Sequence, residues 1–370
     1  MRLALRLAFG ALAIVVVVLL VRAYEDPRRP QIPNRGPPKI GVHMRSIGPA
    51  EVERIAAAGL REIRTTFSWH RVQPERDGPW DWDGYDALME SSAEHGVGVI
   101  PVLIGTPRWA SDSHQLQPLT KAGIAGQNEF VRLAVTRYGP KGRFWRRNPD
   151  LPHRPLRAWQ VWNEPNLNAF WAGRLDPRAY AKLLRTVRGQ ILEVDPGARI
   201  VLAGMPRSVV DYPIDEYLAD LYRLPGFAKL FDVAAIHGYA QDAGVLAGLI
   251  SDTRALLDHN GDREKPIWIT EFGWSAAGPA RDRMRVRDRV GQARELRAAV
   301  QMLRRRARPD RVEKAIWYDL RDTRKPPDEP DRFVYHTGLF DLEGRPKPAW
   351  SALAKVLGGR DGEGSIPAEP

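Results

Sequence analysis

The chain has 370 residues, a formal net charge of +11 and no cysteine. Its length fits two average domains or one large barrel, and 43% hydrophobic with 27% charged residues is a globular composition that excludes a disordered chain and a polytopic membrane protein. Because cysteine is absent, disulfide scaffolds, thiolate catalysis and cysteine-ligated metal centres are excluded as well.

The first 38 residues form two segments that we place outside the folded domain. Arg2 and Arg6 precede an uncharged apolar run over residues 7–21, which suits a signal-peptide core but falls short of the roughly 20 residues that span a bilayer. We predict a signal peptide or an uncleaved membrane anchor over residues 1–23, and a proline- and arginine-rich linker over residues 24–38. The protein is then secreted or anchored to the outer face of the cytoplasmic membrane.

Residues 39–357 alternate short apolar runs with longer amphipathic stretches. The runs, rich in valine and isoleucine, predict strands at 40–44, 63–67, 97–104, 158–162, 199–203, 233–237, 267–270 and 315–318. The amphipathic stretches predict helices that include 50–58, 85–95, 128–138, 177–194 and 292–306. Gly59, Gly96 and Gly139 follow three of these stretches as helix-stop signals.

This alternation predicts an α/β fold with a parallel sheet buried on both faces. Eight units in about 320 residues fit a single closed (β/α)8 TIM barrel over residues 39–357. A doubly wound fold would carry a glycine-rich phosphate loop after the first strand, and residues 44–49 contain none. Residues 358–370, rich in glycine, proline and acids, predict a flexible tail.

Polar residues gather where the predicted strands end, which is where barrel enzymes carry their sites. Glu164 and Glu271 each follow an apolar strand directly, with tryptophans on either side. A charged group at such a place is costly unless something compensates for its lost hydration. Two carboxylates on one rim predict glycoside hydrolysis, in which one acid protonates the leaving oxygen while the other carboxylate attacks the sugar or activates water.

The segments around both glutamates resemble a known family. Residues 162–166 read Trp-Asn-Glu-Pro-Asn and residues 270–273 read Thr-Glu-Phe-Gly, which are similar to the motifs of the clan A retaining glycoside hydrolases, the cellulase-like superfamily. Within that clan, Arg137-Tyr138-Gly139 resembles the xylosidase/iduronidase-type family 39. The resemblance covers nearly the whole barrel. It implies a retaining enzyme that hydrolyses O-glycosidic bonds of a poly- or oligosaccharide without a cofactor.

By this resemblance Glu164 is the general acid/base and Glu271 is the nucleophile. Arg64 and Tyr239 match the residues that support the nucleophile, because an ionised carboxylate needs a cation and hydrogen-bond donors nearby. His237 lies two residues before Tyr239, hence on the same strand face, and we expect it to orient this network. The acid needs the opposite environment, in which apolar surroundings and a neighbouring negative charge raise its pKa.

Further residues are predicted to contact the sugar. Asn163 matches the clan residue that binds the sugar 2-hydroxyl, and His43 closes the first predicted strand. Aromatic rings suit the apolar face of a pyranose, and the candidates for this role are Trp317, Trp274, Trp109 and Trp171. We expect the two carboxyl groups to lie about 5–5.5 Å apart, the spacing of retaining enzymes.

Other features of the sequence bear on which metals and partners the protein binds. No metal site is predicted, because His153 stands alone and paired histidines with ligand spacing are missing. The stretch from Arg281 to Arg311 holds 12 arginines and 4 acids, and we expect either a solvated face or a contact with an anionic membrane or cell-wall surface. Nucleic acid is not an expected partner, since aromatic residues do not interleave with these arginines.

Two other functions use the same barrel. The first is a catalytically inactive barrel that binds polysaccharide, although retention of both glutamates with Arg64 and Tyr239 argues against it. The second is a transglycosylase, which would use the same residues and transfer the sugar to a second sugar instead of water.

Overall fold

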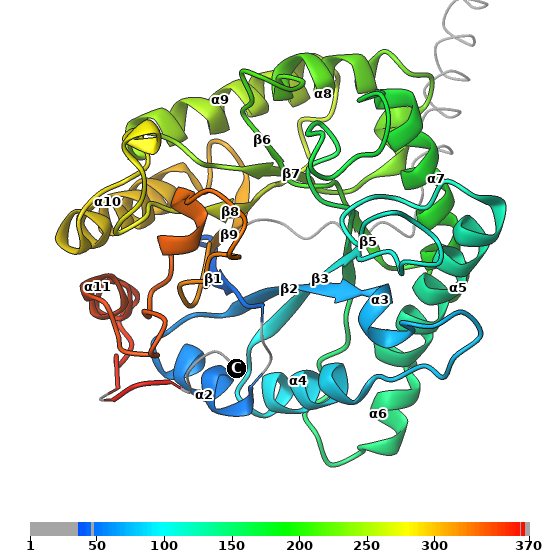
Figure 1. The fold of residues 1–370 in the computed structure, drawn as a ribbon, viewed down its shortest axis with the longest axis horizontal. Coiled ribbons are helices and arrows are strands. Elements are labelled where there is room, and N and C mark those ends of the chain that lie inside the picture. Colours follow the sequence, from blue (N-terminus) through cyan, green and yellow to red (C-terminus); the bar gives the residue numbers. More distant parts are fainter. Residues whose placement is uncertain (1–35, 46–47, 363, 367–370) are drawn as a thin grey trace, which may run out of the picture. The chain divides into compact units, whose positions relative to one another are not determined.

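The computed structural model describes residues 36–45, 48–362 and 364–366. The predicted signal peptide or anchor over residues 1–23, and all of the predicted linker except residues 36–38, lie outside the described residues. The described chain forms a parallel sheet that curls into a TIM-like α/β barrel with helices around it (Figure 1). None of the helices in the described part is long and apolar enough to cross a membrane.

The sheet contains every strand that the sequence predicts. Its order is β5-β4-β3-β2-β1-β9-β8-β7-β6, and all of its ladders are parallel. The strands are β1 (Lys39–His43), β2 (Glu62–Ser68), β3 (Gly98–Ile104), β4 (Ala158–Val161), β5 (Arg199–Val201), β6 (Met205–Pro206), β7 (Ala234–His237), β8 (Ile267–Phe272) and β9 (Val312–Trp317). Parallel strands place all of their carboxyl ends at one end of the barrel.

The strand predicted at 199–203 ends at Val201 as β5, and a separate short strand, β6, follows it at Met205–Pro206. Val201 forms a parallel bridge with Val233, and the Leu202 N–H donates to the Val233 carbonyl over 3.0 Å, so β5 lies against the chain that leads into β7. The two ends of the sheet order therefore meet. The interruption between β5 and β6 coincides with a tertiary contact, because Gly204 lies so close to the His237 side chain that a Cβ would be 2.1 Å from His237 Nε2.

Helices cover the outside of the sheet. They are α2 (Pro49–Ala57), α3 (Trp69–Val72), α4 (Asp83–Glu94), α5 (Lys121–Tyr138), α6 (Arg143–Arg147), α7 (Pro177–Val194), α8 (Ile214–Tyr222), α9 (Ala243–His259), α10 (Arg289–Arg306) and α11 (Pro348–Leu357). The short 3-10 helices among the described residues are η1 (Phe227–Leu230), η2 (Ala280–Asp282) and η3 (Phe333–His336). The predicted stop signals are confirmed at the ends of α2 and α4, where Gly59 and Gly96 have φ of 89° and 72°.

One helix begins earlier than its apolar pattern indicates. α5 begins at Lys121 rather than at residue 128, because the Thr120 hydroxyl caps it by accepting from the Gly123 N–H over 3.0 Å. Gly126 obscures the apolar repeat in this first part of the helix. A Cβ at that position would lie 2.6 Å from the Trp69 ring, so glycine allows α5 to pack closely there.

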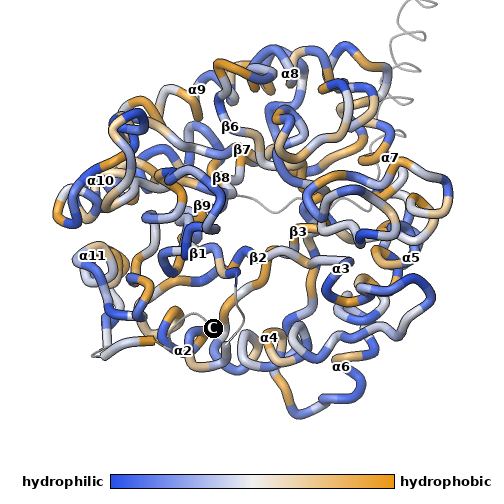
Figure 2. The backbone as a smooth tube through the Cα atoms, viewed as in Figure 1, coloured by the Kyte–Doolittle hydropathy of each residue, from blue (hydrophilic) through white to orange (hydrophobic). Residues whose placement is uncertain are grey.

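The core lies between the sheet and the helices, and polar layers lie at the two ends of the barrel. All six residues of β8 are buried, as expected for a parallel sheet covered on both faces. The helices around the sheet mix hydrophilic and hydrophobic residues (Figure 2). At the end where the strands begin, Arg199 pairs with Glu313 over 3.0 Å and Lys314 pairs with Glu62 over 2.9 Å. At the other end, Arg64 is buried beside the site described below.

The C-terminal segment differs from the predicted flexible tail. The Ile366 N–H donates to the Gly344 carbonyl over 2.8 Å, and the Ile366 side chain is 5% exposed. The Trp350 indole N–H also donates to the Asp361 carbonyl over 2.6 Å. This segment therefore lies against the barrel through backbone hydrogen bonds and the buried Ile366 side chain.

Candidate active site

The predicted catalytic residues meet at the carboxyl ends of the strands. Glu271 lies in β8, Glu164 follows β4, His237 ends β7, Arg64 lies in β2 and Tyr239 follows β7. Because the ladders are parallel, residues that are distant in sequence are brought to one rim. The sequence therefore folds its strand-end polar groups into a single buried cluster.

Glu271 lies between a cation and a phenol. Arg64 Nη1 donates to Glu271 Oε1 over 2.6 Å, and the Tyr239 hydroxyl donates to Glu271 Oε2 over 2.6 Å. Arg64 is 1% exposed, and its other donors bond to Gln160 Oε1 at 2.8 Å and Asn163 Oδ1 at 2.9 Å. Both carboxylate oxygens of Glu271 thus accept strong hydrogen bonds, which favour the ionised form.

Glu164 is placed by an unusual stretch of backbone. Trp162 and Glu164 both adopt the left-handed region, with φ of 74° and 44°. The Glu164 N–H donates to the Gly204 carbonyl over 3.0 Å, and Asn163 forms a parallel bridge with Gly204. Left-handed backbone at non-glycine residues costs about 1–3 kcal/mol each and is concentrated at functional sites. Here it turns the Glu164 side chain toward the centre of the rim.

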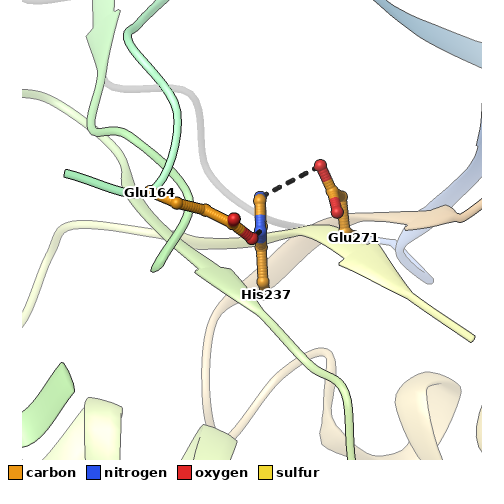
Figure 3. A group of neighbouring side chains, drawn as sticks. All are labelled: Glu164, His237 and Glu271. Carbon is orange, nitrogen blue, oxygen red and sulfur yellow. Dashed lines mark hydrogen bonds and ion pairs between the residues drawn. The ribbon is translucent and has the colours of Figure 1, made fainter. Parts of the chain in front are cut away.

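The ring of His237 lies between the two carboxyl groups (Figure 3). Its Nδ1 is 2.6 Å from Glu164 Oε1, and its Nε2 is 3.4 Å from Glu271 Oε1. The His237 ring is fully buried, and within the described chain no hydrogen-bond partner reaches Nε2. One imidazole therefore contacts both glutamates, through a short hydrogen bond on one side and a longer electrostatic contact on the other.

The same surroundings move the pKa values of the two glutamates in opposite directions. Burial raises the pKa of the Glu164 carboxyl, and the hydrogen bond from His237 offsets only part of that increase. Burial also acts to raise the pKa of Glu271, but the nearby His237 and Arg64 outweigh it and bring that pKa to about 2. A raised pKa at Glu164 beside a lowered pKa at Glu271 is the arrangement that a general acid and a nucleophile require.

This geometry agrees with the comparison to protein families. Residues 79–338 match the model of the glycosyl hydrolase catalytic core family. The chain belongs to this family. It is a glycoside hydrolase, as the resemblance noted in the sequence implied. A search of curated protein sequences finds no match to the chain.

Several solved structures share the fold of this glycoside hydrolase. A family 39 glycoside hydrolase from Bacteroides cellulosilyticus is 18% identical with a TM-score of 0.61, over 89% of this chain and 65% of that one. A β-xylosidase from Caulobacter crescentus is 20% identical with a TM-score of 0.60, over 87% and 69% of the two chains. A GH5_18 protein from Streptomyces cattleya, solved with GlcNAc, is 18% identical with a TM-score of 0.61, over 90% and 83%.

The four tryptophans that are predicted to contact the sugar differ in their solvent exposure. Trp317 and Trp274 are fully buried, and their indole N–H groups donate to the carbonyls of Thr337 and Gln241 over 3.0 Å each. Trp171 is 3% exposed. Trp109 is partly exposed. The geometry gives Trp317, Trp274 and Trp171 packing contacts around the glycoside hydrolase site, and direct sugar contact by any of the four stays a prediction.

Asn163 and His43 both lie at the Arg64 side of the site. Asn163 Oδ1 accepts from Arg64 Nη2 over 2.9 Å. His43 Nδ1 is 3.2 Å from Arg64 Nη1, so the imidazole accepts from the guanidinium. Burial, with the charge of Arg64 next, holds the pKa of His43 well below its ordinary value. A neutral His43 is therefore one of the groups that orient Arg64.

Two residues that position Arg64 and Glu164 were not predicted from the sequence. Both lie in apolar stretches, which the sequence pattern assigns to the packed core. Gln160 receives the Arg64 Nε–H at 2.8 Å, and its own amide donates to the Leu202 carbonyl at 3.0 Å. Gly204 supplies the carbonyl that holds the Glu164 N–H. Gln160 could have been found, since it is a polar residue in the middle of an apolar strand, whereas Gly204 carries no signal of its own.

Tyr318 is a further site residue that was not predicted from the sequence. It lies beside the site at the end of β9, where the sequence predicted that its neighbour Trp317 would contact the sugar. Its ring centroid is 5.1 Å from that of His43 and 6.1 Å from that of Tyr239. Arg45 donates to the Tyr318 hydroxyl and, over 2.8 Å, to Asp319. Tyr318 is partly exposed, so this rim offers an aromatic surface next to the glutamates.

Glu164, His237 and Glu271 could also be considered as metal ligands. One ligand atom from each lies within 4.8 Å of the others, which is close enough for one cation. However, Arg64 already contacts Glu271 Oε1 at 2.6 Å. A divalent ion at that oxygen would have to displace a buried guanidinium with four hydrogen-bonding contacts. The donor set fits proton transfer better than cation binding.

Proposed function

We propose that the protein is a retaining glycosidase that acts on a poly- or oligosaccharide, with Glu271 as nucleophile and Glu164 as acid/base. In the first step a Glu271 oxygen bonds to the anomeric carbon, the bond to the leaving oxygen breaks, and the Glu164 proton moves to that oxygen. In the second step water attacks the anomeric carbon, Glu164 takes a proton from it, and Glu271 leaves as carboxylate. Two inversions give net retention.

One observation carries the proposal. An oxygen of Glu164 and an oxygen of Glu271 lie within 4.8 Å of each other, and the two carboxyl groups have opposite environments. Retaining enzymes hold their carboxyl groups about 5–5.5 Å apart, whereas inverting enzymes need about 6.5–9.5 Å to admit a water. The short separation supports direct attack by Glu271.

The scaffold we propose is the complete eight-unit barrel, with β5 and β6 counted as one interrupted strand. The bridge between Val201 and Val233 supports closure at this point. Asn163 is proposed to donate its amide to the sugar 2-hydroxyl while its oxygen stays on Arg64. Tyr318 and Tyr239, both partly exposed beside the glutamates, are proposed to contact the same sugar ring.

The stereochemical outcome tests this proposal. Proton NMR of early product from an aryl glycoside that is turned over should show the anomeric configuration of the substrate. Initial release of the inverted anomer would contradict the role of Glu271. Transfer of the sugar to an added sugar acceptor in preference to water would identify a transglycosylase instead, and no turnover across aryl glycosides and polysaccharides would favour the binding barrel.

His237→Ala is expected to move the pH–rate profile to higher pH. His237 lowers the pKa of both glutamates, so its removal lets both values rise. Activity needs Glu271 ionised and Glu164 protonated, so both the acidic and the basic limbs of kcat/KM should shift upward. The measurement is kcat/KM against pH, with His95→Ala as a control at the other end of the barrel. Unmoved limbs, or limbs shifted downward, would refute this role.

Gly204→Ala is expected to reduce kcat by about 10²-fold while the protein stays folded, because displacement of about 1 Å at a catalytic group has effects of that size. The new Cβ would lie 2.1 Å from His237 Nε2 and 2.4 Å from Thr270 Oγ1, so His237 has to move. Gly248→Ala in α9 is the matched control, since nothing lies within 4 Å of its new Cβ. Steady-state kinetics and melting temperatures of both variants check this, and equal kcat values would contradict it.

A further inference from the structure

The end of the barrel where the strands begin is strongly basic. The connection from α5 to β4, residues 139–157, runs across this end and contains α6. Its exposed charged residues are Lys141, Arg143, Arg146, Arg147, Arg154 and Arg157, against one exposed acid, Asp150. The α5–β4 connection therefore has a large excess of exposed positive charge.

The α5–β4 connection is held in a fixed position. The Trp145 indole N–H donates to the Tyr138 carbonyl over 3.1 Å, and Phe144 and Trp145 are 4% and 6% exposed. Arg154 reaches across to the Gly96 carbonyl, just before β3, at 3.4 Å. With the aromatic side chains turned into the core, the cationic side chains of this segment face solvent.

The arginines of α10 divide between the two ends of the barrel. Figure 2 shows hydrophilic and hydrophobic residues alternating along this helix. Arg304, Arg305 and Arg308 are exposed where α10 ends and the chain turns into β9, so they belong to the strand-start end. Arg283 lies before the helix, at the catalytic end. The basic stretch noted in the sequence therefore reaches both ends of the barrel, with Arg294 and Arg297 exposed along α10 between them.

The catalytic end is different in charge. Its connections, which run from strands to helices, contain exposed acids among the arginines, such as Asp81, Asp112 and Asp328. The α5–β4 connection therefore carries a larger excess of exposed positive charge than the connections at the catalytic end.

The N-terminal residues join the barrel at this same end. β1 begins at Lys39, which pairs in register with Lys314 in β9, close behind the arginines that follow α10. Residues 7–21 are apolar and uncharged in sequence. An apolar segment of this kind and the basic end of the barrel are thus joined by residues 24–38.

We propose that the strand-start end of the barrel docks on an anionic lipid surface, with the catalytic end facing away from the membrane. Cations near an anionic leaflet are attracted within about one Debye length of it, about 8–10 Å. Charge complementarity supports lipid headgroups as the partner, and the attachment point of the apolar segment favours a membrane over a soluble acidic polymer. The orientation leaves Glu164 and Glu271 open to substrate outside.

Site-specific fluorescence on the full chain tests this orientation, because the absence of native cysteine makes single labels possible. Asp150→Cys labels the basic end, and Ala277→Cys labels the exposed loop after β8 at the catalytic end. The full chain is reconstituted with vesicles of phosphatidylcholine, alone or with phosphatidylglycerol, that carry a nitroxide quencher on the headgroup. On the anionic vesicles we expect at least about twofold more quenching at position 150 than at position 277.

The preference should depend on charge. The difference in quenching between positions 150 and 277 should vanish on neutral vesicles and in high salt. It should also vanish in the variant Arg143→Glu/Arg147→Glu/Arg157→Glu. That variant should keep wild-type activity on a soluble substrate. Arg174→Glu/Arg283→Glu/Arg332→Glu, at the catalytic end, makes the same change in net charge and should keep the preference. Equal quenching at both labels, stronger quenching at position 277, or no vesicle binding would overturn the proposal. Soluble polygalacturonate that displaces the protein from anionic vesicles at low concentration would assign the surface to an acidic polymer instead.

Discussion

Glu271→Gln is expected to lower kcat by about 10⁴-fold or more, the size of effect seen when a catalytic nucleophile is removed. Glutamine keeps the shape of the side chain and an oxygen that can accept from Arg64, but its amide does not displace the leaving oxygen. Substrate binding should persist, so KM or the Kd for a substrate analogue should change little. Steady-state kinetics together with a binding titration separate the two quantities.

A second expected effect of Glu271→Gln concerns stability. Arg64 is buried and pairs with Glu271 at 2.6 Å, and removing one member of a buried pair typically costs about 3–5 kcal/mol. Glu313→Gln is the matched control, because Glu313 pairs with Arg199 at 3.0 Å at the other end of the barrel. We expect that variant to lose stability but to keep kcat. A Glu271→Gln enzyme with wild-type kcat would refute the nucleophile assignment.

Glu164→Ala should make the rate depend on the leaving group. A dinitrophenolate leaves without protonation, so its first step should be nearly unchanged, whereas alkyl and sugar leaving groups should lose about 10²–10⁴-fold, the usual contribution of general acid catalysis. The second step slows as well, because no base is left to take the proton from water. Added azide attacks without needing a base, so it should restore turnover and give a glycosyl azide of retained configuration.

The pH dependence of Glu164→Ala gives an independent check. In the proposed mechanism the raised pKa of Glu164 sets the basic limb of the native enzyme, where activity falls as pH rises and the acid loses its proton. That limb should disappear in the variant. Glu51→Gln, which alters another buried carboxylate that pairs with Arg321 at 2.8 Å, should keep the limb. A basic limb that survives in Glu164→Ala would assign the acid to another residue.

The fold could be predicted in most of its elements because its signals are local. Apolar runs of β-branched residues mark the strands, and glycines mark the ends of α2 and α4. The interruption between β5 and β6 could not be predicted, because it coincides with a contact between Gly204 and His237, distant in sequence. The early start of α5 was hidden for a similar reason, since Gly126 is required by a tertiary contact with Trp69.

The candidate site was predictable where chemistry requires a particular residue type. Two strand-end glutamates, a buried arginine and a tyrosine stand out in the sequence, and the structure brings Glu164, Glu271, Arg64 and Tyr239 together. The direction in which each side chain points could not be predicted from the sequence. Trp317 and Tyr318 are neighbours at the end of β9, and only the three-dimensional structure shows that Tyr318 is the one beside His43 and Tyr239.

The identity of the nucleophile is tested most directly by trapping the covalent intermediate. A panel of 2-deoxy-2-fluoro glycosides with good leaving groups slows the second step, so the sugar that fits the site should accumulate on the enzyme. Digestion and mass spectrometry should then find the fluoroglycosyl group on Glu271, and the label should be absent from Glu271→Gln. A label on Glu164 or on any other residue would contradict the mechanism proposed for this enzyme.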